Sequence, residues 1–267
     1  LSRKNSQMDP LIIIPARGGS TRVPNKNLAD INGKPLIYYS IKAALLSGNN
    51  NIFVSTDSPE IAKVSEDLGV RVPFLRPEKL SCPNSTSISV IIHILNKLIE
   101  EKSKIPEIIL FKPPTNPFLT PESIANMIDL KIKNRNIDSV MSIFKPKVSA
   151  LSYLNYSETD KRINTQIYDI EGIRLYDNER SQDRPISYAS SPACKVTESS
   201  YFLKEYIENK ITADKSTGPT FNFRNSLGYL ISNLEAHDID SLEDLDMAKL
   251  IIEGGKDICP KDIFTHT

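Results

Sequence analysis

The chain has 267 residues, of which 39% are hydrophobic, and its 33 basic residues balance its 33 acidic residues. This length and apolar content allow a substantial core in one large domain or two small ones, and they exclude a disordered or fibrous chain. The formal net charge of zero argues against a general nucleic-acid binder or a membrane-surface binder. An anionic ligand must therefore be met by a local cluster of cations.

Cysteine usage and the lack of long apolar runs point to a cytoplasmic protein. Cys82, Cys194 and Cys259 are widely spaced and odd in number, which argues against a disulfide framework or a structural zinc site. No apolar run approaches the roughly 20 residues of a membrane span. The polar residues 1–9 lack the pattern of a secretory leader, and residues 1–7, which precede Met8, are interpreted as a candidate vector remnant.

The first predicted element is a buried strand at residues 11–14, four consecutive aliphatic residues of the kind found in parallel sheets. Gly18 and Gly19 follow it. We expect their backbone amides to converge on the oxygens of a ligand, because glycine allows close approach and positive φ. The same loop carries three cations, Arg17, Arg22 and Lys26.

This combination of strand, diglycine and three cations predicts a phosphate-binding loop. Arginine offers a planar fork to phosphate and lysine offers a point charge. A solvated basic turn is the alternative, but such a turn does not need three cations. No Gly-Lys-Ser/Thr closes the loop and no third glycine follows, so it is neither a Walker A loop nor a dinucleotide-binding fingerprint.

Residues 11–27 resemble the signature of the acylneuraminate cytidylyltransferase family, a strand followed by Ala-Arg-Gly-Gly-Ser, a basic residue, Pro and Lys-Asn. Members of that family activate nonulosonates, and relatives activate 3-deoxy-octulosonate. The resemblance implies that this loop binds the nucleotide through Ala16, Arg17, Gly18, Gly19, Ser20, Arg22, Lys26 and Asn27.

The following residues alternate between helical and strand patterns, which is typical of a parallel sheet with right-handed crossovers. Asp57 follows the second strand, where it is either a metal ligand or the cap of the next helix, and we favour the cap. The expected helices are at residues 35–46, 59–68, 87–99 and 199–207, with another that Thr120 caps, and the expected strands are at residues 52–55, 70–75, 107–111, 139–144 and 226–234.

Two later segments match the family in part. Arg76 begins an Arg-Pro-x-x-Leu segment, which implies that its side chain lies near the cytidine. Residues 113–119 resemble the sugar-side segment Gln-Pro-Thr-Ser-Pro-Leu-Arg, which implies that Thr115 and Asn116 contact the acceptor sugar. The family's Gln, Ser and Arg are replaced there by Pro113, Asn116 and Leu119.

Residues 145–189 are polar, rich in tyrosine and without a clear period. Loops of this length are usually functional or interfacial. The corresponding region of the family forms the dimer contact, so we expect a homodimer, with a surface excursion of one monomer as the alternative. Arg180 and Gln182 lie in a segment that resembles the family's Arg-Arg-Gln-Asp-x-Pro, which implies contact with the sugar, whereas Ser191-Pro192 replaces the family's Asn-Gly.

Asp238 and Asp240 form the second chemical motif. In an extended segment, residues two apart point the same way, so both carboxylates can face one hard cation. Ser241 and Asp244 then begin a helix as a capping pair, and the alternative is that Asp240 belongs to that cap. The family carries its Asp-x-Asp metal ligands at this place, so we favour Mg²⁺ bound by Asp238 and Asp240.

The expected fold is a single three-layer α/β/α domain with a mostly parallel sheet, nucleotide-diphospho-sugar transferase-like (GT-A-like), over residues 8–254. Residues 145–189 are expected as a dimerisation and active-site extension, and residues 255–267 as a C-terminal tail. The fold rests on the alternating pattern, and its GT-A-like character on the resemblance.

The resemblance implies a cytidylyltransferase that uses CTP to activate an acidic sugar, a nonulosonate such as N-acetylneuraminate. Arg17, Lys26, Asp238 and Asp240 are expected to act in catalysis. The alternatives are activation of 3-deoxy-octulosonate or another sugar, a GT-A-like glycosyltransferase, and a non-catalytic nucleotide-binding relative.

Overall fold

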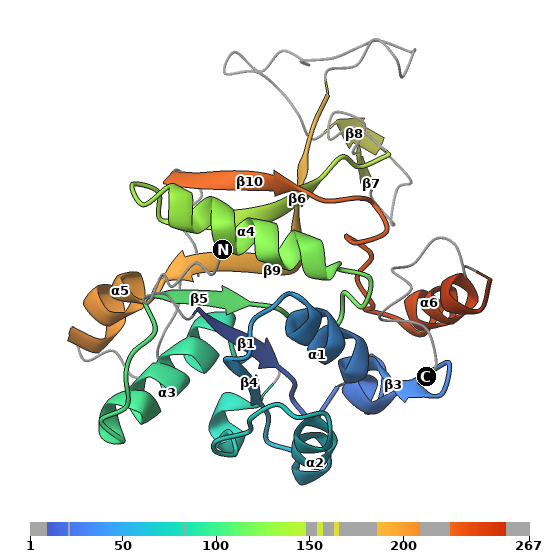
Figure 1. The fold of residues 1–267 in the computed structure, drawn as a ribbon. Helices are drawn as coiled ribbons and strands as arrows, with labels where there is room; N and C mark the ends of the chain where they lie inside the picture. Colours follow the sequence, from blue (N-terminus) through green and yellow to red (C-terminus); the bar gives the residue numbers. More distant parts are fainter. Residues whose placement is uncertain are drawn as a thin grey trace, which may run out of the picture.

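A six-stranded sheet forms the centre of the molecule (Figure 1). The computed structural model describes residues 10–20, 22–82, 84–147, 154–156, 163–165, 186–208 and 225–254. Within these residues the strand order across the sheet is β10-β6-β9-β5-β1-β4. The strands are β1 (Leu11–Pro15), β4 (Ile52–Ser55), β5 (Ile108–Phe111), β6 (Ser139–Phe144), β9 (Ala189–Glu198) and β10 (Ser226–Leu230).

The sheet is parallel except at one strand. β1 pairs in parallel with β4 and with β5, and β6 pairs in parallel with β10. β9 runs antiparallel to both of its neighbours, β5 and β6. The expected mostly parallel sheet is therefore confirmed, and its single antiparallel strand joins two parallel parts.

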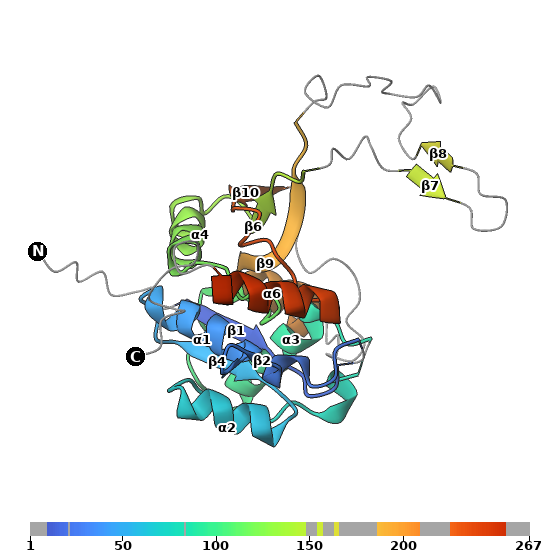
Figure 2. The same cartoon turned by 90° about the vertical axis from the view of Figure 1, so that its right-hand side faces the viewer.

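Helices cover both faces of the sheet and complete the three layers (Figures 1 and 2). Alternate residues of β1 point to opposite faces, so Ile12 enters one core cluster and Ile13 enters the other. The first cluster includes residues of α1 (Leu36–Leu46), α2 (Pro59–Asp67), α4 (Pro121–Lys133) and α6 (Leu242–Gly254). The second includes residues of α3 (Ser87–Glu100) and α5 (Ser199–Phe202).

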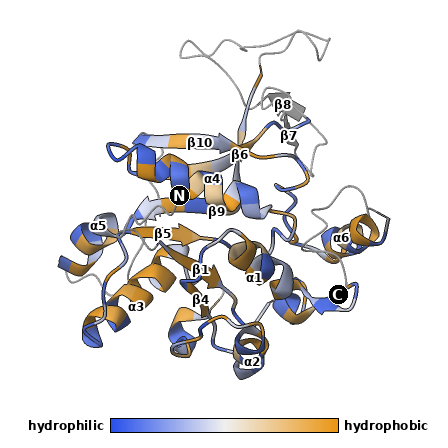
Figure 3. Cartoon of the chain, viewed as in Figure 1, coloured by the Kyte–Doolittle hydropathy of each residue, from blue (hydrophilic) through white to orange (hydrophobic). Residues whose placement is uncertain are grey.

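This double coverage explains the sequence pattern of the central strands. β1, β4 and β5 are almost entirely buried, which is why their residues are apolar in runs and do not alternate with polar ones (Figure 3). α4 begins where expected, with the Thr120 side chain accepting a hydrogen bond from the Ser123 amide at 3.1 Å. After the first loop, β2 (Asp30–Ile31) and β3 (Lys34–Pro35) pair as a small antiparallel hairpin.

Some expected elements differ in extent. Residues 70–75 do not form a strand, because only Arg71 bridges Phe53 in parallel and Pro73 lacks the N–H that a longer ladder needs. The helix expected at residues 199–207 is confirmed as α5, which continues as a π-helix labelled η5 (Leu203–Glu208). The last strand, β10, is shorter than expected, and ends at Leu230.

Most of the expected extension at residues 145–189 lies outside the described residues. Its described part includes β7 (Leu154–Tyr156) and β8 (Ile163–Thr165), which pair antiparallel and lie apart from the six-stranded sheet in Figure 2. Across the described part of the chain, no helix is both long enough and apolar enough to cross a membrane.

Candidate active site

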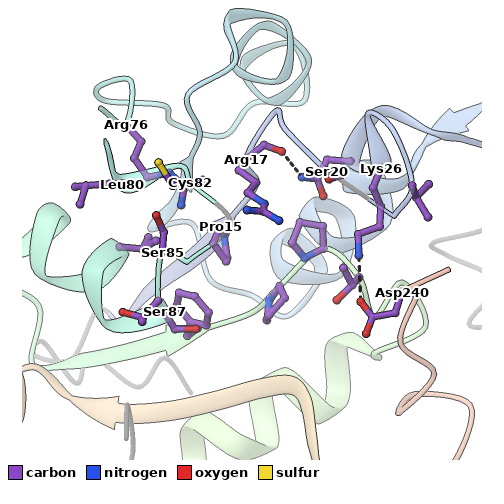
Figure 4. A pocket seen from close by; sticks show the side chains of 18 of the residues that line it. Pro15, Arg17, Ser20, Lys26, Arg76, Leu80, Cys82, Ser85, Ser87 and Asp240 are labelled. Atoms are coloured by element: carbon purple, nitrogen blue, oxygen red, sulfur yellow. Dashed lines mark hydrogen bonds and ion pairs between the residues drawn. The ribbon is translucent and has the colours of Figure 1, made fainter. Parts of the chain in front are cut away.

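A cavity of about 320 Å³ opens at the carboxyl ends of β1 and β5 (Figure 4). These two strands are neighbours, but the chain leaves β1 through α1 and enters β4 on the other side of β1. Open α/β sheets bind ligands at such switch points. The cavity is lined by the loop after β1, the start of α3, the turn after β5, Arg76 and Asp240.

The loop after β1 is held in place by its own buried residues. Val23 is 2% exposed and belongs to the core cluster of α1, which anchors the middle of the loop. The Asn27 side chain is buried and donates a hydrogen bond to the Arg17 carbonyl at 2.8 Å. The loop therefore presents Arg17, Arg22 and Lys26 to the cavity on a braced backbone.

The Gly18 amide has a partner that the sequence did not predict. It donates to the Asp57 carboxylate at 2.9 Å, and neither Gly18 nor Gly19 has a positive φ. A Cβ on Gly18 would lie 3.1 Å from the Cβ of Ser58, which explains a glycine there. Nothing lies within 4 Å of a Cβ placed on Gly19, and nothing in the structure explains that glycine.

The expectation that Asp57 caps α2 is wrong. The cap is Ser58, whose hydroxyl accepts from the Ile61 amide at 3.3 Å. Asp57 instead holds Gly18 and lies 3.9 Å from the Arg76 guanidinium. The first loop and Arg76 are thereby tied to one carboxylate, a contact that the local sequence around Asp57 cannot reveal.

Arg76 is buried beside the cavity, as its expected place near the nucleotide requires. Its Nε donates to the Ser81 hydroxyl at 3.1 Å. Burial lowers the pKa of Arg76, the charge of Asp57 opposes this, and the positive charge of Arg17 adds to the lowering. Two guanidinium groups thus face the same cavity (Figure 4), where an anionic ligand would relieve their mutual repulsion.

The two chemical motifs of the sequence meet across the cavity. The Lys26 Nζ lies 3.4 Å from the Asp240 carboxylate and donates to the Ile239 carbonyl at 2.7 Å (Figure 4). The Arg22 guanidinium lies 3.2 Å from the same carboxylate. Two of the three loop cations therefore have an acidic partner, which the sequence places more than 200 residues away. Both ion pairs are partly exposed, so the attraction between the charges is weak. A phosphate ligand can therefore replace Asp240 as the partner of either cation.

Asp238 lies deeper than Asp240. Burial raises the pKa of Asp238, a hydrogen bond from Thr115 opposes this, and the charge of Asp240 adds to the rise. Its Oδ1 atom is buried and has no hydrogen-bond partner among the described residues. A buried carboxylate oxygen without a partner, next to a second carboxylate, is a donor set that fits a hard divalent cation. The described residues hold no cluster of three or more metal-ligating side chains.

The side chain that caps α6 is not that of Asp240. The Ser241 hydroxyl accepts from the Asp244 amide at 3.2 Å, and the Asp244 carboxylate accepts from the Ser241 amide at 2.8 Å. This reciprocal pair caps α6. The Asp240 carboxylate does not take part and points to Lys26 and Arg22.

The other expected site residues either line the cavity, lie buried behind it, or fall outside the described residues. Ser20 and Thr115 line the cavity with the loop cations, whereas Ala16 is buried in the core and does not line it. Asn116 is fully buried and its amide donates to the His237 carbonyl at 3.0 Å, so it braces the wall and does not present its side chain to the cavity. Arg180 and Gln182 lie outside the described residues.

Some cavity residues were not singled out in the sequence. Ser85, Thr86 and Ser87 at the start of α3 line the wall next to Arg76, and Leu80 and Cys82 complete it. Thr86 caps α3 by accepting from the Ser89 amide. A run of hydroxyl residues before a strongly amphipathic helix was the available signal, because helix starts of this kind often face anions.

A mostly parallel sheet with a cationic cavity at its switch point, lined by Asp240 with Asp238 buried beside it, is suited to bind the phosphates of a nucleotide. Comparisons with known proteins give the class of protein. The family model described as cytidylyltransferase matches residues 11–258. The chain therefore belongs to the cytidylyltransferase family, as its motifs predicted, and it is an enzyme.

Named relatives and one solved structure agree with this assignment. The CMP-N,N'-diacetyllegionaminic acid synthase of Legionella pneumophila is 33% identical over 91% of this chain and 96% of its own length. The pseudaminic acid cytidylyltransferase of Campylobacter jejuni serotype O:2 is 30% identical over the same shares. A solved CMP:2-keto-3-deoxy-manno-octonic acid synthetase complexed with CTP matches with a TM-score of 0.62 at 15% identity, and covers 92% of this chain and 99% of that one. At that identity the last match shows a shared fold, which confirms the expected fold class.

Proposed function

We propose that this cytidylyltransferase activates a nonulosonate with CTP and forms the CMP-sugar and pyrophosphate. The observation that carries the proposal is the meeting of Lys26 and Arg22 with Asp240 across one cavity, because it joins a phosphate-binding loop to a carboxylate pair. The names of the two relatives support the sugar class, since legionaminic and pseudaminic acids are both nonulosonates.

The reaction is an in-line displacement at phosphorus. The anomeric hydroxyl of the sugar attacks the α-phosphorus of CTP, a new P–O bond forms, the bond to the β-phosphate oxygen breaks, and the hydroxyl proton leaves to solvent. Such a reaction needs positioning and charge neutralisation more than a protein nucleophile. Arg17 and Lys26 hold the phosphates and offset the negative charge that grows on pyrophosphate. Arg76, buried beside the start of α3, contacts the nucleoside end of CTP.

We further propose that Asp238 and Asp240 hold Mg²⁺. The buried, unpartnered Oδ1 of Asp238 supports this, because such an atom otherwise costs free energy. When bound, the ion lowers the pKa of the attacking hydroxyl and screens the phosphates. Thr115 holds Asp238 through its hydrogen bond, and Lys26 holds Asp240 until the nucleotide arrives.

Pyrophosphate release tests this function. The purified enzyme with CTP and Mg²⁺ should release pyrophosphate with at least one of legionaminate, pseudaminate and N-acetylneuraminate, and more slowly with 3-deoxy-octulosonate. UTP and GTP serve as nucleotide controls. No release of pyrophosphate with any sugar would support the non-catalytic alternative. Faster release with 3-deoxy-octulosonate than with the nonulosonates would show that the substrate is an octulosonate. Transfer of a sugar from a ready-made nucleotide sugar would indicate a glycosyltransferase instead.

We also propose a cytoplasmic homodimer with the extension at residues 145–189 in its interface. The described residues at the root of the extension support the dimer. Ile186 and Tyr188 precede β9 with exposed fractions of 64% and 55%, and Leu230, at the end of β10, is 57% exposed. Both groups flank the end of β6, because Leu230 pairs with Ile143 and Ala189 with Phe144.

Light scattering tests the dimer. Wild-type protein at micromolar concentration should have twice the mass of one chain, and Tyr188→Asp should shift the mass toward that of one chain, because a charge in an apolar contact is costly. A wild-type mass of one chain would contradict the dimer. Cell fractionation tests the cytoplasmic location, which is supported by the scattered cysteines.

A further inference from the structure

Lys112 directly follows β5 and is completely buried. Among the described residues, the other completely buried lysine is Lys131, whose Nζ lies 2.6 Å from the Glu198 carboxylate. Lys112 has no carboxylate partner of this kind among the described residues. Its pKa is shifted by burial and by Cys194, and by no carboxylate of that part of the chain. A buried amine without a counter-ion costs free energy unless it is hydrogen-bonded.

The hydrogen bonds of Lys112 fasten the turn after β5 at two points. Its Nζ donates to the Asn116 carbonyl at 3.2 Å and to the Ser40 hydroxyl on α1 at 2.7 Å. The Ser40 hydroxyl in turn donates to the Pro114 carbonyl at 3.3 Å. One amine thus fixes two carbonyl groups of residues 113–116, which we call the 113–116 turn.

The 113–116 turn carries the carboxylate segment of the site. The Thr115 carbonyl accepts from the Ile239 amide at 2.8 Å, and the Thr115 side chain hydrogen-bonds to Asp238. The Asn116 amide donates to the His237 carbonyl at 3.0 Å. The two aspartates are therefore placed by contacts with a turn that the Lys112 amine holds.

We propose that Lys112 is a positioning residue that sets the 113–116 turn and, through it, places the carboxylates of Asp238 and Asp240. Lys112 does not reach the cavity and does not touch substrate. The inference rests on the proposed function for what the carboxylates do, but the positioning itself is a property of the free protein.

The charge state of Lys112 agrees with this role. A neutral amine has two N–H donors, which match the two acceptors of Ser40 and Asn116, whereas an ammonium would bury a third donor. Burial lowers the pKa of Lys112 to about 7, and the neighbouring Cys194 on β9 opposes the shift. Burial raises the pKa of the Cys194 thiol to about 12, so this thiol is neutral where Lys112 titrates.

Hydrogen exchange in the free protein tests the positioning directly. In Lys112→Met, which keeps an unbranched side chain one heavy atom shorter and has no donor, the Ile239 amide should exchange at least tenfold faster than in the wild type. Lys131→Met is the matched control, because it also removes a completely buried lysine but lies on α4 away from the 113–116 turn. An unchanged Ile239 exchange rate in Lys112→Met, or an equal rise in Lys131→Met, would overturn the inference.

Kinetics then separate positioning from general damage. Lys112→Met should lower kcat about tenfold or more and raise the Mg²⁺ concentration for half-maximal rate, because misplaced catalytic groups lose rate steeply. CTP affinity should fall by a smaller factor than kcat, because the backbone that carries Arg17 and Lys26 is braced by Asn27 and Asp57, although the Lys26 amine also donates to the Ile239 carbonyl. A loss confined to CTP affinity would contradict the proposal. If the wild type itself releases no pyrophosphate, the proposed function fails while the exchange result for Ile239 still decides the positioning.

Two further variants keep the test decisive if Lys112→Met does not fold. Ser40→Ala removes the link to Pro114 and one acceptor of the Lys112 amine, but it leaves the hydrogen bond to the Asn116 carbonyl, so it should speed Ile239 exchange in the same direction by a smaller factor. Lys112→Arg should behave no better than Lys112→Met, because a guanidinium is larger and stays charged in a site that suits a neutral amine. Wild-type exchange in Ser40→Ala together with full kcat in Lys112→Arg would overturn the inference.

The pH dependence of unfolding tests the charge state. The unfolded chain keeps the Lys112 proton up to about 10.5, whereas the folded chain loses it near 7. The unfolded state therefore binds more protons in that window, and wild-type stability should rise with pH there more steeply than that of Lys112→Met. The groups that face Lys112 are the Ser40 hydroxyl, the Asn116 carbonyl and Cys194, none of which titrates between these values. Identical slopes for the two proteins would show an ordinary, charged lysine and overturn the assigned charge state.

Discussion

The loop after β1 and the segment before α6 form facing walls of the same cavity, but they are held in different ways. The loop is tied by side chains next to it, with Asn27 on the Arg17 carbonyl and Asp57 on the Gly18 amide. The carboxylate segment is braced locally by the Asp244 carboxylate on the Asp240 amide, and it also hydrogen-bonds to the 113–116 turn and to the Lys26 amine. The loop backbone is thus braced by its own Asn27 and by Asp57 after β4, whereas the carboxylate segment is placed largely by the 113–116 turn and Lys26.

This difference teaches how one site separates binding from chemistry. The cations of the loop rest on a backbone braced by Asn27 and Asp57, so they suit ground-state binding of phosphates. The carboxylates must be placed accurately relative to a reacting centre, and their placement comes from the fold around them. In the free protein the two walls neutralise each other through Lys26 and Asp240, and a nucleotide with its metal would replace that pair.

The largest expected effect tests the carboxylate wall. Asp240→Asn should lower kcat by about a hundredfold or more while CTP affinity changes little, because the lost charge matters most as charge develops in the transition state. Asp246→Asn on α6, whose carboxylate pairs with Lys249, is the control for the loss of one negative charge. Near-normal turnover in Asp240→Asn would remove this residue from the catalytic site.

The second effect tests the cationic wall. Lys26→Ala should weaken CTP binding about thirtyfold with the fold intact, as expected for a lost charge-assisted hydrogen bond. Lys63→Ala, which removes an exposed lysine paired with Asp67 on α2, is the matched control. Calorimetry that finds unchanged CTP affinity in Lys26→Ala would contradict the phosphate-site assignment. Tighter binding of UTP or GTP than of CTP would contradict the assignment of cytosine as the base.

The third effect tests the bracing of the loop. Asp57→Ala should weaken CTP binding about tenfold, because it frees the Gly18 amide and leaves Arg76 without its carboxylate. Ser58→Ala removes the cap of α2 and should lower stability by about 1 kcal/mol without a comparable loss of affinity. Equal losses of CTP affinity in the two variants would show that Asp57 acts only through α2.

The smallest effect separates the two paired cations. The Arg22 side chain is 72% exposed, whereas that of Lys26 is 15% exposed. Arg22→Ala should therefore weaken CTP binding only about threefold, and the difference from wild type should shrink as salt is added. A loss as large as that of Lys26→Ala, and equally large at high salt, would show that Arg22 becomes buried against the nucleotide.

The sequence by itself determined the elements that repeat locally. Residues 11–14 predicted β1 because a run of aliphatic residues suits a strand covered on both faces. The amphipathic spacing predicted α3, and the hydroxyl of Thr120 predicted the start of α4. The first motif also indicated the family, which the match over residues 11–258 confirms. These signals work because each depends on residues within a few positions of one another.

Only the tertiary structure decided which distant groups meet. Asp57 sits beside a helix start and reads as its cap, but the sheet order places it against Gly18, and Ser58 takes the cap. The pair of Lys26 with Asp240 spans 214 positions, and the burial of Lys112 follows from layers packed on both faces of β5. Such contacts depend on strand order and on the competition of several partners for one group, and no local spacing of residues records either.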